Sequence, residues 1–267
     1  MHTINGGGGL AATVDVAHGG RIVSLTSGGR EWLSPSLPLP KGAPRTFVHS
    51  GTGGWDEAIP TVEACVLADG TVLADHGEVW DREWQVTSAS EHHLGTSVSL
   101  QSLPLVFERL ITATTSGLRF DWRVTTASTA PVSFLWSAHP LFTADLATRV
   151  TSDSPGEATG EYPQRGAAAP SKLALGDLDE GAALKAFVRG ATRASVVHAD
   201  GSAITLAWSA ADLPHLGLYL DRGEFTTHGV VAIEPTMAAT DSAARAPELW
   251  SVSAGLDRVW HIDVSTL

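Results

Sequence analysis

Two ionisable side chains stand where an apolar strand is expected to end. Glu234 closes the run VVAIE before Pro235, and His139 follows FLWSA before Pro140. A carboxylate inside an apolar strand must be hydrogen-bonded, paired with a cation or kept neutral, and each of these perturbs its pKa. Because perturbed acids gather at functional sites, this carboxylate and imidazole form a candidate acid–base pair. Pro140 is expected to keep its strand from continuing as a central one.

The third candidate is His76 in the stretch ADHGEVW, where Glu78 stands two residues further on. On one strand these two side chains would share a face, and with His139 or Glu234 they would complete a metal site of two histidines and one carboxylate. Such a site usually shows a second histidine close by, which this stretch lacks, so we predict no metal. Three structural alternatives stay open: His76 as a turn residue, His139 as a hydrogen-bonded core histidine, and Glu234 as the partner of a structural arginine.

The segments that must position these residues have the period of β-strands. Apolar and polar residues alternate, or nearly so, in four runs: RIVSLTS (21–27), TSVSLQS (96–102), LRFDWRV (118–124) and RVWHIDV (258–264). This alternation is typical of half-buried strands. Two further runs are apolar throughout and suit central strands covered on both faces, namely VSFLWSA (132–138) and GVVAIE (229–234).

Turn signals separate the expected strands. Asp-Gly pairs, which favour tight hairpins, stand at 69–70 and 200–201, and Ser-Gly-Gly-Arg at 27–30 joins two strand-like runs. Helical signal is scarce. The Ala-rich stretch 237–247 suits a short helix or an irregular loop, and the Pro- and Gly-rich stretch 152–181 suits a long excursion over one face of the sheets. We therefore predict an all-β fold: a single domain, residues 1–267, built as one large antiparallel β-sandwich with few short helices.

The composition limits the classes of function. The chain has 267 residues, 43% of them hydrophobic and 17% charged, which is enough apolar material for a sizeable core. A formal net charge of −12 without any basic run argues against binding to nucleic acid or to an anionic membrane. One cysteine, no apolar run of membrane-span length and no secretory pattern in MHTINGGGGL give the expectation of a cytoplasmic protein.

Six motifs in collinear order resemble those of the aldose 1-epimerase (galactose mutarotase-like) family: GGRIVSL (19–25), GGWDEAIPTV (53–62), ADHGEVW (74–80), WSAHPLF (136–142), GLYLDRG (217–223) and AIEPTMAATDS (232–242). Each motif alone is moderately specific, and their order and spacing together are much more so. The resemblance implies a large β-sandwich, which agrees with the strand periodicity. The chain is shorter than the well-known galactose mutarotases and resembles a compact, bacterial-type branch.

The resemblance also implies roles for individual residues. Glu234 corresponds to the general base, His139 to the general acid, and His76 to a second imidazole that contacts the sugar ring. Longer mutarotases carry an Asn and a His just before the HG pair, and here those positions are Ala74 and Asp75. The expected substrate contacts lie in or beside the motifs: Trp55 and Trp80 as platforms for a sugar face, Asp221 or Asp56 as the sugar-binding aspartate, and Glu57, Arg82 and Glu78 as ligands of ring hydroxyls.

These roles imply an enzyme that interconverts the α and β anomers of an aldose with neither metal nor organic cofactor. The base takes the proton of the C1 hydroxyl while the acid protonates the ring oxygen, and the two swap roles on ring closure. The expected partner is a monosaccharide, with no nucleic acid and no membrane, and the chain is expected to be a monomer or a homodimer. Two alternatives are a non-catalytic carbohydrate-binding protein on the same scaffold and an epimerase for a phosphorylated or modified sugar.

Overall fold

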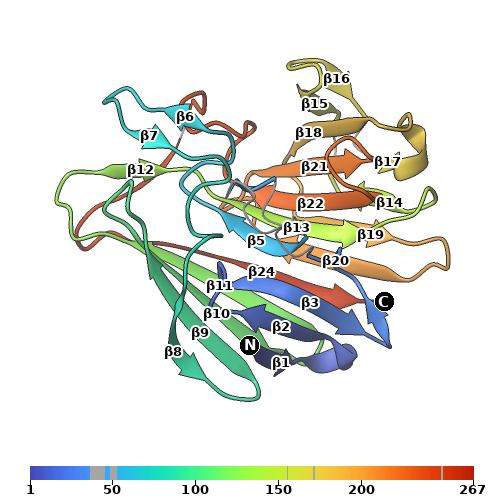
Figure 1. Ribbon diagram of the computed structural model, residues 1–267, viewed down its shortest axis with the longest axis horizontal. Coiled ribbons are helices and arrows are strands. Elements are labelled where there is room, and N and C mark those ends of the chain that lie inside the picture. Colours follow the sequence, from blue (N-terminus) through green and yellow to red (C-terminus); the bar gives the residue numbers. More distant parts are fainter. Residues whose placement is uncertain (37–45, 49–52, 155, 171, 248) are drawn as a thin grey trace.

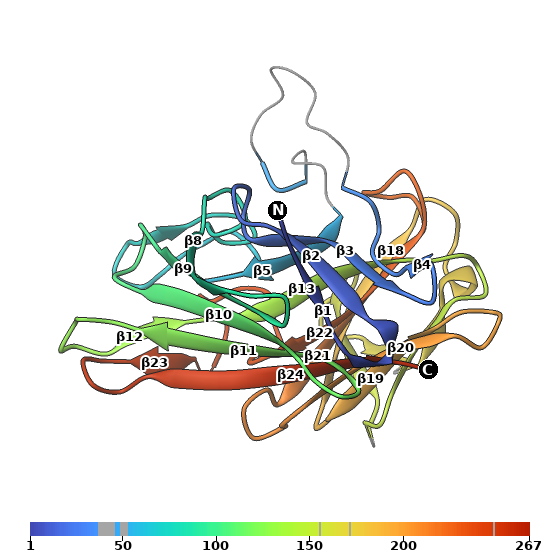
Figure 2. The ribbon, with the colours of Figure 1, turned by 90° about the horizontal axis from the view of Figure 1, so that it is seen from below.

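The computed structural model describes residues 1–36, 46–48, 53–154, 156–170, 172–247 and 249–267, and two large antiparallel sheets form most of that part (Figures 1 and 2). The first sheet contains, in spatial order, β1 (His2–Asn5), β2 (Ala11–Asp15), β3 (Arg21–Ser27), β5 (Gly54–Ala58), β13 (Ser137–Thr143), β22 (Val230–Thr236), β21 (His215–Asp221), β18 (Ala183–Arg189), β15 (Ala158–Tyr162) and β16 (Ala168–Ala169), with β4 (Arg30–Glu31) paired to β3.

The second sheet contains β17 (Leu173–Ala174), β14 (Arg149–Ser152), β19 (Arg193–Val197), β20 (Ala203–Trp208), β24 (Arg258–Thr266), β11 (Gly117–Thr125), β10 (Val106–Ala113), β9 (His93–Ser99) and β8 (Gln85–Ala89). Smaller elements are the pair β6 (Cys65–Val66) and β7 (Val72–Leu73), the pair β12 (Val132–Phe134) and β23 (Trp250–Val252), and the 3-10 turns η1 (Gly7–Gly9) and η2 (Leu175–Asp177). Among the described residues, no helix reaches the length and apolarity needed to cross a membrane.

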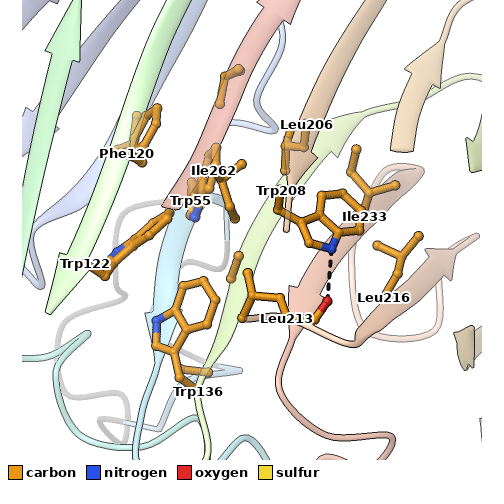
Figure 3. Packing of buried hydrophobic residues seen from close by; sticks show 14 of the residues in the cluster. Trp55, Phe120, Trp122, Trp136, Leu206, Trp208, Leu213, Leu216, Ile233 and Ile262 are labelled. Carbon is orange, nitrogen blue, oxygen red and sulfur yellow. Dashed lines mark hydrogen bonds between the residues drawn. The ribbon is translucent and has the colours of Figure 1, made fainter. Parts of the chain in front are cut away.

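The core lies between the two large sheets and is rich in tryptophan (Figure 3). Trp55 of β5 stacks on Phe120 of β11 with ring centroids 4.8 Å apart, and Trp122 meets Trp136 at 4.9 Å. Every tryptophan except Trp250 is buried. Rings of this size bury much apolar area and pack in specific orientations, so these aromatic contacts hold the two sheets together.

The all-β sandwich predicted from the sequence is confirmed. Strands β3, β11 and β24 contain the predicted runs 21–27, 118–124 and 258–264, and both Asp-Gly pairs lie in the turns of hairpins. The strand predicted at 96–102 lies three residues earlier in the structure, because β9 begins at His93 and ends at Ser99. The chain turns there, since the Leu100 N–H donates to the Leu105 carbonyl at 2.9 Å.

Two segments differ more from the prediction. The stretch 237–247 forms turns and bends, as in the irregular-loop alternative. The stretch 152–181 is not a structureless excursion: β15, β16 and β17 arise within it and extend the edges of both sheets. Pro163 and Gly166 lie in the turn between β15 and β16, and strands of two to five residues are too short to show a period in the sequence.

The predicted strand 132–138 is divided between β12 and β13, and the prediction for Pro140 was wrong. Pro140 lies in the middle of β13, which is a central strand between β5 and β22. A proline donates no ladder hydrogen bond, so a central strand can hold one only where the ladder is interrupted. Residues 138–141 of β13 form no ladder pair with β22, although both strands are fully described, and β22 carries Pro235 opposite this gap.

Candidate functional site

A cavity of about 340 Å³ opens over the middle of the first sheet, on the face turned away from the second sheet. The alternation along β22 shows which face this is. Val231 and Ile233 join the core between the sheets, whereas Val230 and Ala232 belong to a separate small cluster with Leu141, which lines the cavity. Residue 234 has the parity of 230 and 232, so Glu234 points into the cavity and not into the core.

The register of the first sheet aligns ionisable side chains in one row beneath the cavity. Asp56 of β5 is paired with His139 of β13, and Gly217 of β21 is paired with Glu234 of β22. The pairs on either side of the β13–β22 gap have residue numbers that place His139 directly opposite Glu234. The two prolines interrupt the ladder at this point, so the predicted acid and base are neighbours where the sheet is least regular.

Glu234 is fully buried and uses only one of its carboxylate oxygens. Its Oε2 accepts a hydrogen bond from the ammonium group of Lys185, while Oε1 is buried with no hydrogen-bond partner among the described residues. Burial raises the pKa of Glu234, Lys185 opposes that rise, and Asp241 adds to it. The free oxygen is therefore a desolvated proton acceptor on a side chain that lines the cavity.

His139 is the second buried ionisable group of the cavity. Its side chain is only 8% exposed, and its Nδ1 has no hydrogen-bond partner in the described part of the chain. Burial lowers the pKa of His139 well below its ordinary 6.5, and the nearby His76 and Lys185 lower it further. The imidazole is therefore neutral at neutral pH in the empty cavity.

His76 stands on a constrained turn. Its φ is +54°, a left-handed conformation that histidine adopts more readily than most residues, and Gly77 follows with φ of +68°. A Cβ at residue 77 would lie 1.9 Å from the Ile59 carbonyl oxygen, so only glycine fits there. The turn presents the His76 ring to the cavity, where it stacks on Phe47 at 3.7 Å and meets His139 edge-on at 4.9 Å. His76 is thus both a turn residue and a cavity residue.

The Nδ1 atom of His76 lies 3.0 Å from an oxygen of Asp75, which is close enough for an ion pair when the ring is protonated. The alignment is not that of a hydrogen bond, because Nδ1 has no hydrogen-bond partner among the described residues. We regard the contact as electrostatic, since hydrogen bonds weaken steeply when they bend. The charge of Asp75 therefore acts on the His76 ring at close range.

The state of His139 can be tested directly. The imidazole resonances of His139 are expected not to titrate between about pH 6 and pH 8, because burial keeps the ring neutral over that range. Histidine-selective ¹⁵N NMR measures the titration, and His139→Asn identifies the resonances by their loss. Exposed His18, in the same spectra, serves as the internal comparison. A His139 ring that takes up a proton with a midpoint near 6.5 would contradict this.

The three predicted catalytic residues line the cavity, and the seven predicted substrate contacts do not. On β5 the side chains alternate, so Trp55 and Glu57 point into the core between the sheets, and neither is more than 1% exposed. Asp56 lies on the cavity side but is paired with Arg21, whose Nε is 2.9 Å from Oδ1. Trp55 and Glu57 are thus core residues of the sheet, and Asp56 is buried with Arg21 as its partner.

The other four predicted contacts support loops around the cavity. Trp80 packs edge-on against Phe47 behind the cavity wall. Glu78 is paired with Arg82 at 2.7 Å and also accepts the backbone N–H groups of residues 101 and 102. Asp221 accepts three backbone N–H groups, from residues 223, 224 and 225, at 2.8–3.1 Å. Carboxylates occupied in this way stabilise turns.

The sequence analysis missed two charged residues of the site, Lys185 and Asp241. Both line the cavity, and Asp241 Oδ1 lies 3.4 Å from Lys185 Nζ. Asp241 stands inside the motif AIEPTMAATDS without having been assigned a role. Lys185 interrupts the apolar run ALKAFV, and a lone cation in such a run is the signal that could have indicated it. Within the described ranges, no three His, Cys, Asp or Glu side chains are grouped so that they could hold a metal ion.

Several solved structures share this architecture over nearly the whole chain. A galactose mutarotase-like protein from Lactobacillus casei ATCC 334 aligns with 17% identity and a TM-score of 0.77, covering 100% of both chains. A galactose mutarotase related enzyme from Lactobacillus acidophilus aligns with 15% identity and a TM-score of 0.77, covering 100% of this chain and 97% of the other. A GalM/aldose epimerase homologue from C. elegans aligns with 15% identity and a TM-score of 0.73, covering 100% and 98%.

No protein-family model and no curated protein sequence matches the chain. The likeness to solved structures is therefore one of fold, found at low sequence identity. It agrees with the resemblance that the six collinear motifs indicated, and the chain has the galactose mutarotase-like fold.

Proposed function

We propose that the protein is an aldose 1-epimerase, with Glu234 as general base and His139 as general acid. The observation that carries the proposal is the pair of buried, unpartnered atoms that these two residues present to one cavity, Oε1 of Glu234 and Nδ1 of His139. Most buried polar groups in proteins are hydrogen-bonded. Ten buried side-chain atoms of the described residues lack a hydrogen-bond partner, and the three on cavity-lining residues are these two and Nδ1 of His76. A ligand rich in hydroxyl groups would supply the missing partners.

The chemistry follows from this pair. Glu234 takes the proton of the C1 hydroxyl and the bond between C1 and the ring oxygen breaks. His139, which takes up a proton from solvent as the sugar binds, delivers that proton to the ring oxygen. Rotation about the C1–C2 bond exposes the other face of the aldehyde. On closure the ring hydroxyl attacks C1, His139 takes the hydroxyl proton back and Glu234 returns its proton to the C1 oxygen. Each such positioned proton transfer contributes about 10²–10⁴ in rate.

The environment of the two groups suits this exchange of roles. Burial raises the pKa of Glu234 and lowers that of His139, so the two values move toward each other. A base and an acid that must swap functions in each half-reaction work best when neither holds the proton much more tightly than the other.

The cavity favours a neutral sugar over a phosphorylated one. Its volume of about 340 Å³ is at the small end of ligand sites and suits a monosaccharide. Histidines aside, the charged side chains that line it among the described residues are five carboxylates and two cations: Glu63, Asp75, Glu161, Glu234, Asp241, Arg165 and Lys185. Both cations are already paired with carboxylates. A phosphate group would need free arginine or lysine donors.

Exchange between anomers tests the proposal. With the protein present, NMR exchange spectroscopy and polarimetry are expected to show faster α–β interconversion of at least one neutral aldose, with glucose, galactose, mannose and xylose as the first panel. Glucose 6-phosphate is the comparison for a charged substrate, and the protein is expected to accelerate its α–β interconversion less. Sugar binding without any acceleration would instead support the non-catalytic carbohydrate-binding alternative, and no effect on any sugar would overturn the proposal.

A further inference from the structure

Lys185 reaches the candidate base across a neighbouring strand. Lys185 lies on β18 and Glu234 on β22, with β21 between them. Lys185 is paired in the sheet with Tyr219, and Glu234 with Gly217, so the lysine side chain must run diagonally over β21. It ends in contact with Glu234 Oε2, and Asp241 Oδ1 stands 3.4 Å from the same ammonium group.

Gly217 provides the opening that makes this contact possible. A Cβ at residue 217 would lie 3.3 Å from Cε of Lys185 and 3.3 Å from Oε2 of Glu234. Such contacts are tighter than ordinary packing, so any larger side chain would push the lysine and the carboxylate apart. The φ of Gly217 is not in the left-handed region, so the missing side chain and not the backbone conformation is what this position supplies.

A purely structural ion pair would be built differently. A buried pair is weak evidence for stability, because removing two charges from water costs as much as their attraction returns unless the remaining lone pairs are also satisfied. Here one carboxylate oxygen is left without a partner among the described residues, on a side chain that lines the cavity. The lysine side chain is 7% exposed and also lines the cavity. The arrangement therefore occupies one oxygen and leaves the other available.

We propose that Lys185 is a positioning residue for the base: its ammonium group, anchored by Asp241, holds Glu234 ionised with Oε1 directed toward the substrate. This inference rests on the proposed function. Without a cation beside it, a fully desolvated carboxylate takes up a proton and can no longer accept one from the sugar. Lys185 itself transfers no proton, and its part is to fix the charge and the orientation of Glu234.

The test uses Lys185→Met, which keeps the length of the side chain and removes its charge. Infrared difference spectroscopy follows the protonated carboxyl band of Glu234 with pH, and Glu234→Gln identifies that band by its absence. The titration midpoint of Glu234 is expected to rise by about one pH unit or more in Lys185→Met. Lys172→Met removes an exposed lysine and is the matched control, expected to leave the midpoint unchanged.

Activity gives a second, separate measurement. In Lys185→Met the acidic limb of the kcat profile for anomer exchange is expected to move to higher pH with the infrared midpoint, and Lys185→Arg, which keeps the charge, is expected to restore much of the lost rate. Gly217→Ala should raise the infrared titration midpoint of Glu234 as well, but by less. If Lys185→Met does not fold, Gly217→Ala serves as the test of the role of Lys185. An unchanged infrared midpoint in the folded variants would overturn the role of Lys185. Absence of anomer exchange in the unaltered protein would overturn the proposed function and leave the infrared result to stand alone.

Discussion

Glu234→Gln is expected to reduce kcat for anomer exchange by about 10²–10⁴-fold while the protein remains folded. The amide has the shape of the carboxylate, but its oxygen is too weak a base to take the C1 hydroxyl proton. Lys185 would lose one of its two carboxylate partners and keep the other, because Asp241 Oδ1 lies 3.4 Å from Nζ. The buried ammonium group is therefore not left alone, and the loss should fall on the rate and not on the fold.

The measurement is NMR exchange spectroscopy on the best substrate of the panel, with sugar affinity measured separately by calorimetry. Glu63→Gln is the matched control. Glu63 also lines the cavity, but its side chain is 39% exposed and is paired with Arg165 and Arg245. The control is expected to retain most of the rate. If Glu234→Gln retained the rate as well, Glu234 would not be the base, and if only affinity fell, the residue would serve binding alone.

The sequence indicated the proposed base and the proposed acid because each carries a local anomaly. A glutamate or a histidine in an apolar run, with a proline directly after it, contradicts the pattern around it, and such conflicts tend to mark functional sites. Their placement opposite each other depends on the register of β13 against β22, which no local pattern contains. The pairing of Lys185 with Glu234, 49 residues away in the chain, is equally absent from any local pattern.

The burial of the predicted substrate contacts on β5 has a physical explanation. The segment Gly54–Ala58 begins with glycine and carries two acidic residues, which is typical of a solvated loop, yet all five of its residues are buried. Its acidic side chains are tolerated there because arginines distant in sequence pair with them, 35 residues away for Asp56 and 52 residues away for Glu57. Burial of charge depends on such long-range partners, so the local sequence does not reveal that these residues lie inside the sheet.

The ion pair of Arg109 with Glu57 joins the two sheets. Arg109 of β10 donates from Nη1 to Oε1 of Glu57 at 3.0 Å, and a second N–H donates to the Gly20 carbonyl oxygen. Trp136 Nε1 donates to the other oxygen of Glu57 at 3.0 Å, and the guanidinium group lies over the Trp84 ring at 4.7 Å. Both side chains of the ion pair are fully buried. The pair is therefore an ionic contact inside an aromatic core.

Arg109→Met is expected to lower the free energy of unfolding by about 3–5 kcal/mol, because it leaves Glu57 buried without its cation. Denaturant unfolding followed by tryptophan fluorescence measures the loss. Arg123→Met is the control on the neighbouring strand, where the arginine is half-exposed and is paired with Asp257, and it is expected to change little. The double variant Arg109→Met with Glu57→Gln should recover part of the stability, since neither residue then carries a buried charge.

The stability that Arg109→Met loses should also depend on pH in a defined direction. Burial raises the pKa of Glu57 from its ordinary 4.5 to about 7 even with Arg109 beside it. The stability that comes from protonating Glu57 in the folded state is therefore fully present below about pH 4.5 and is lost as the pH rises through about 7. Without Arg109 the folded-state pKa rises further, so Arg109→Met continues to lose stability above that pH while the unaltered protein does not. The destabilisation should be larger at about pH 8 than at about pH 5. An equal loss at both values would contradict this, because it would mean that Arg109 acts through packing and not through its charge.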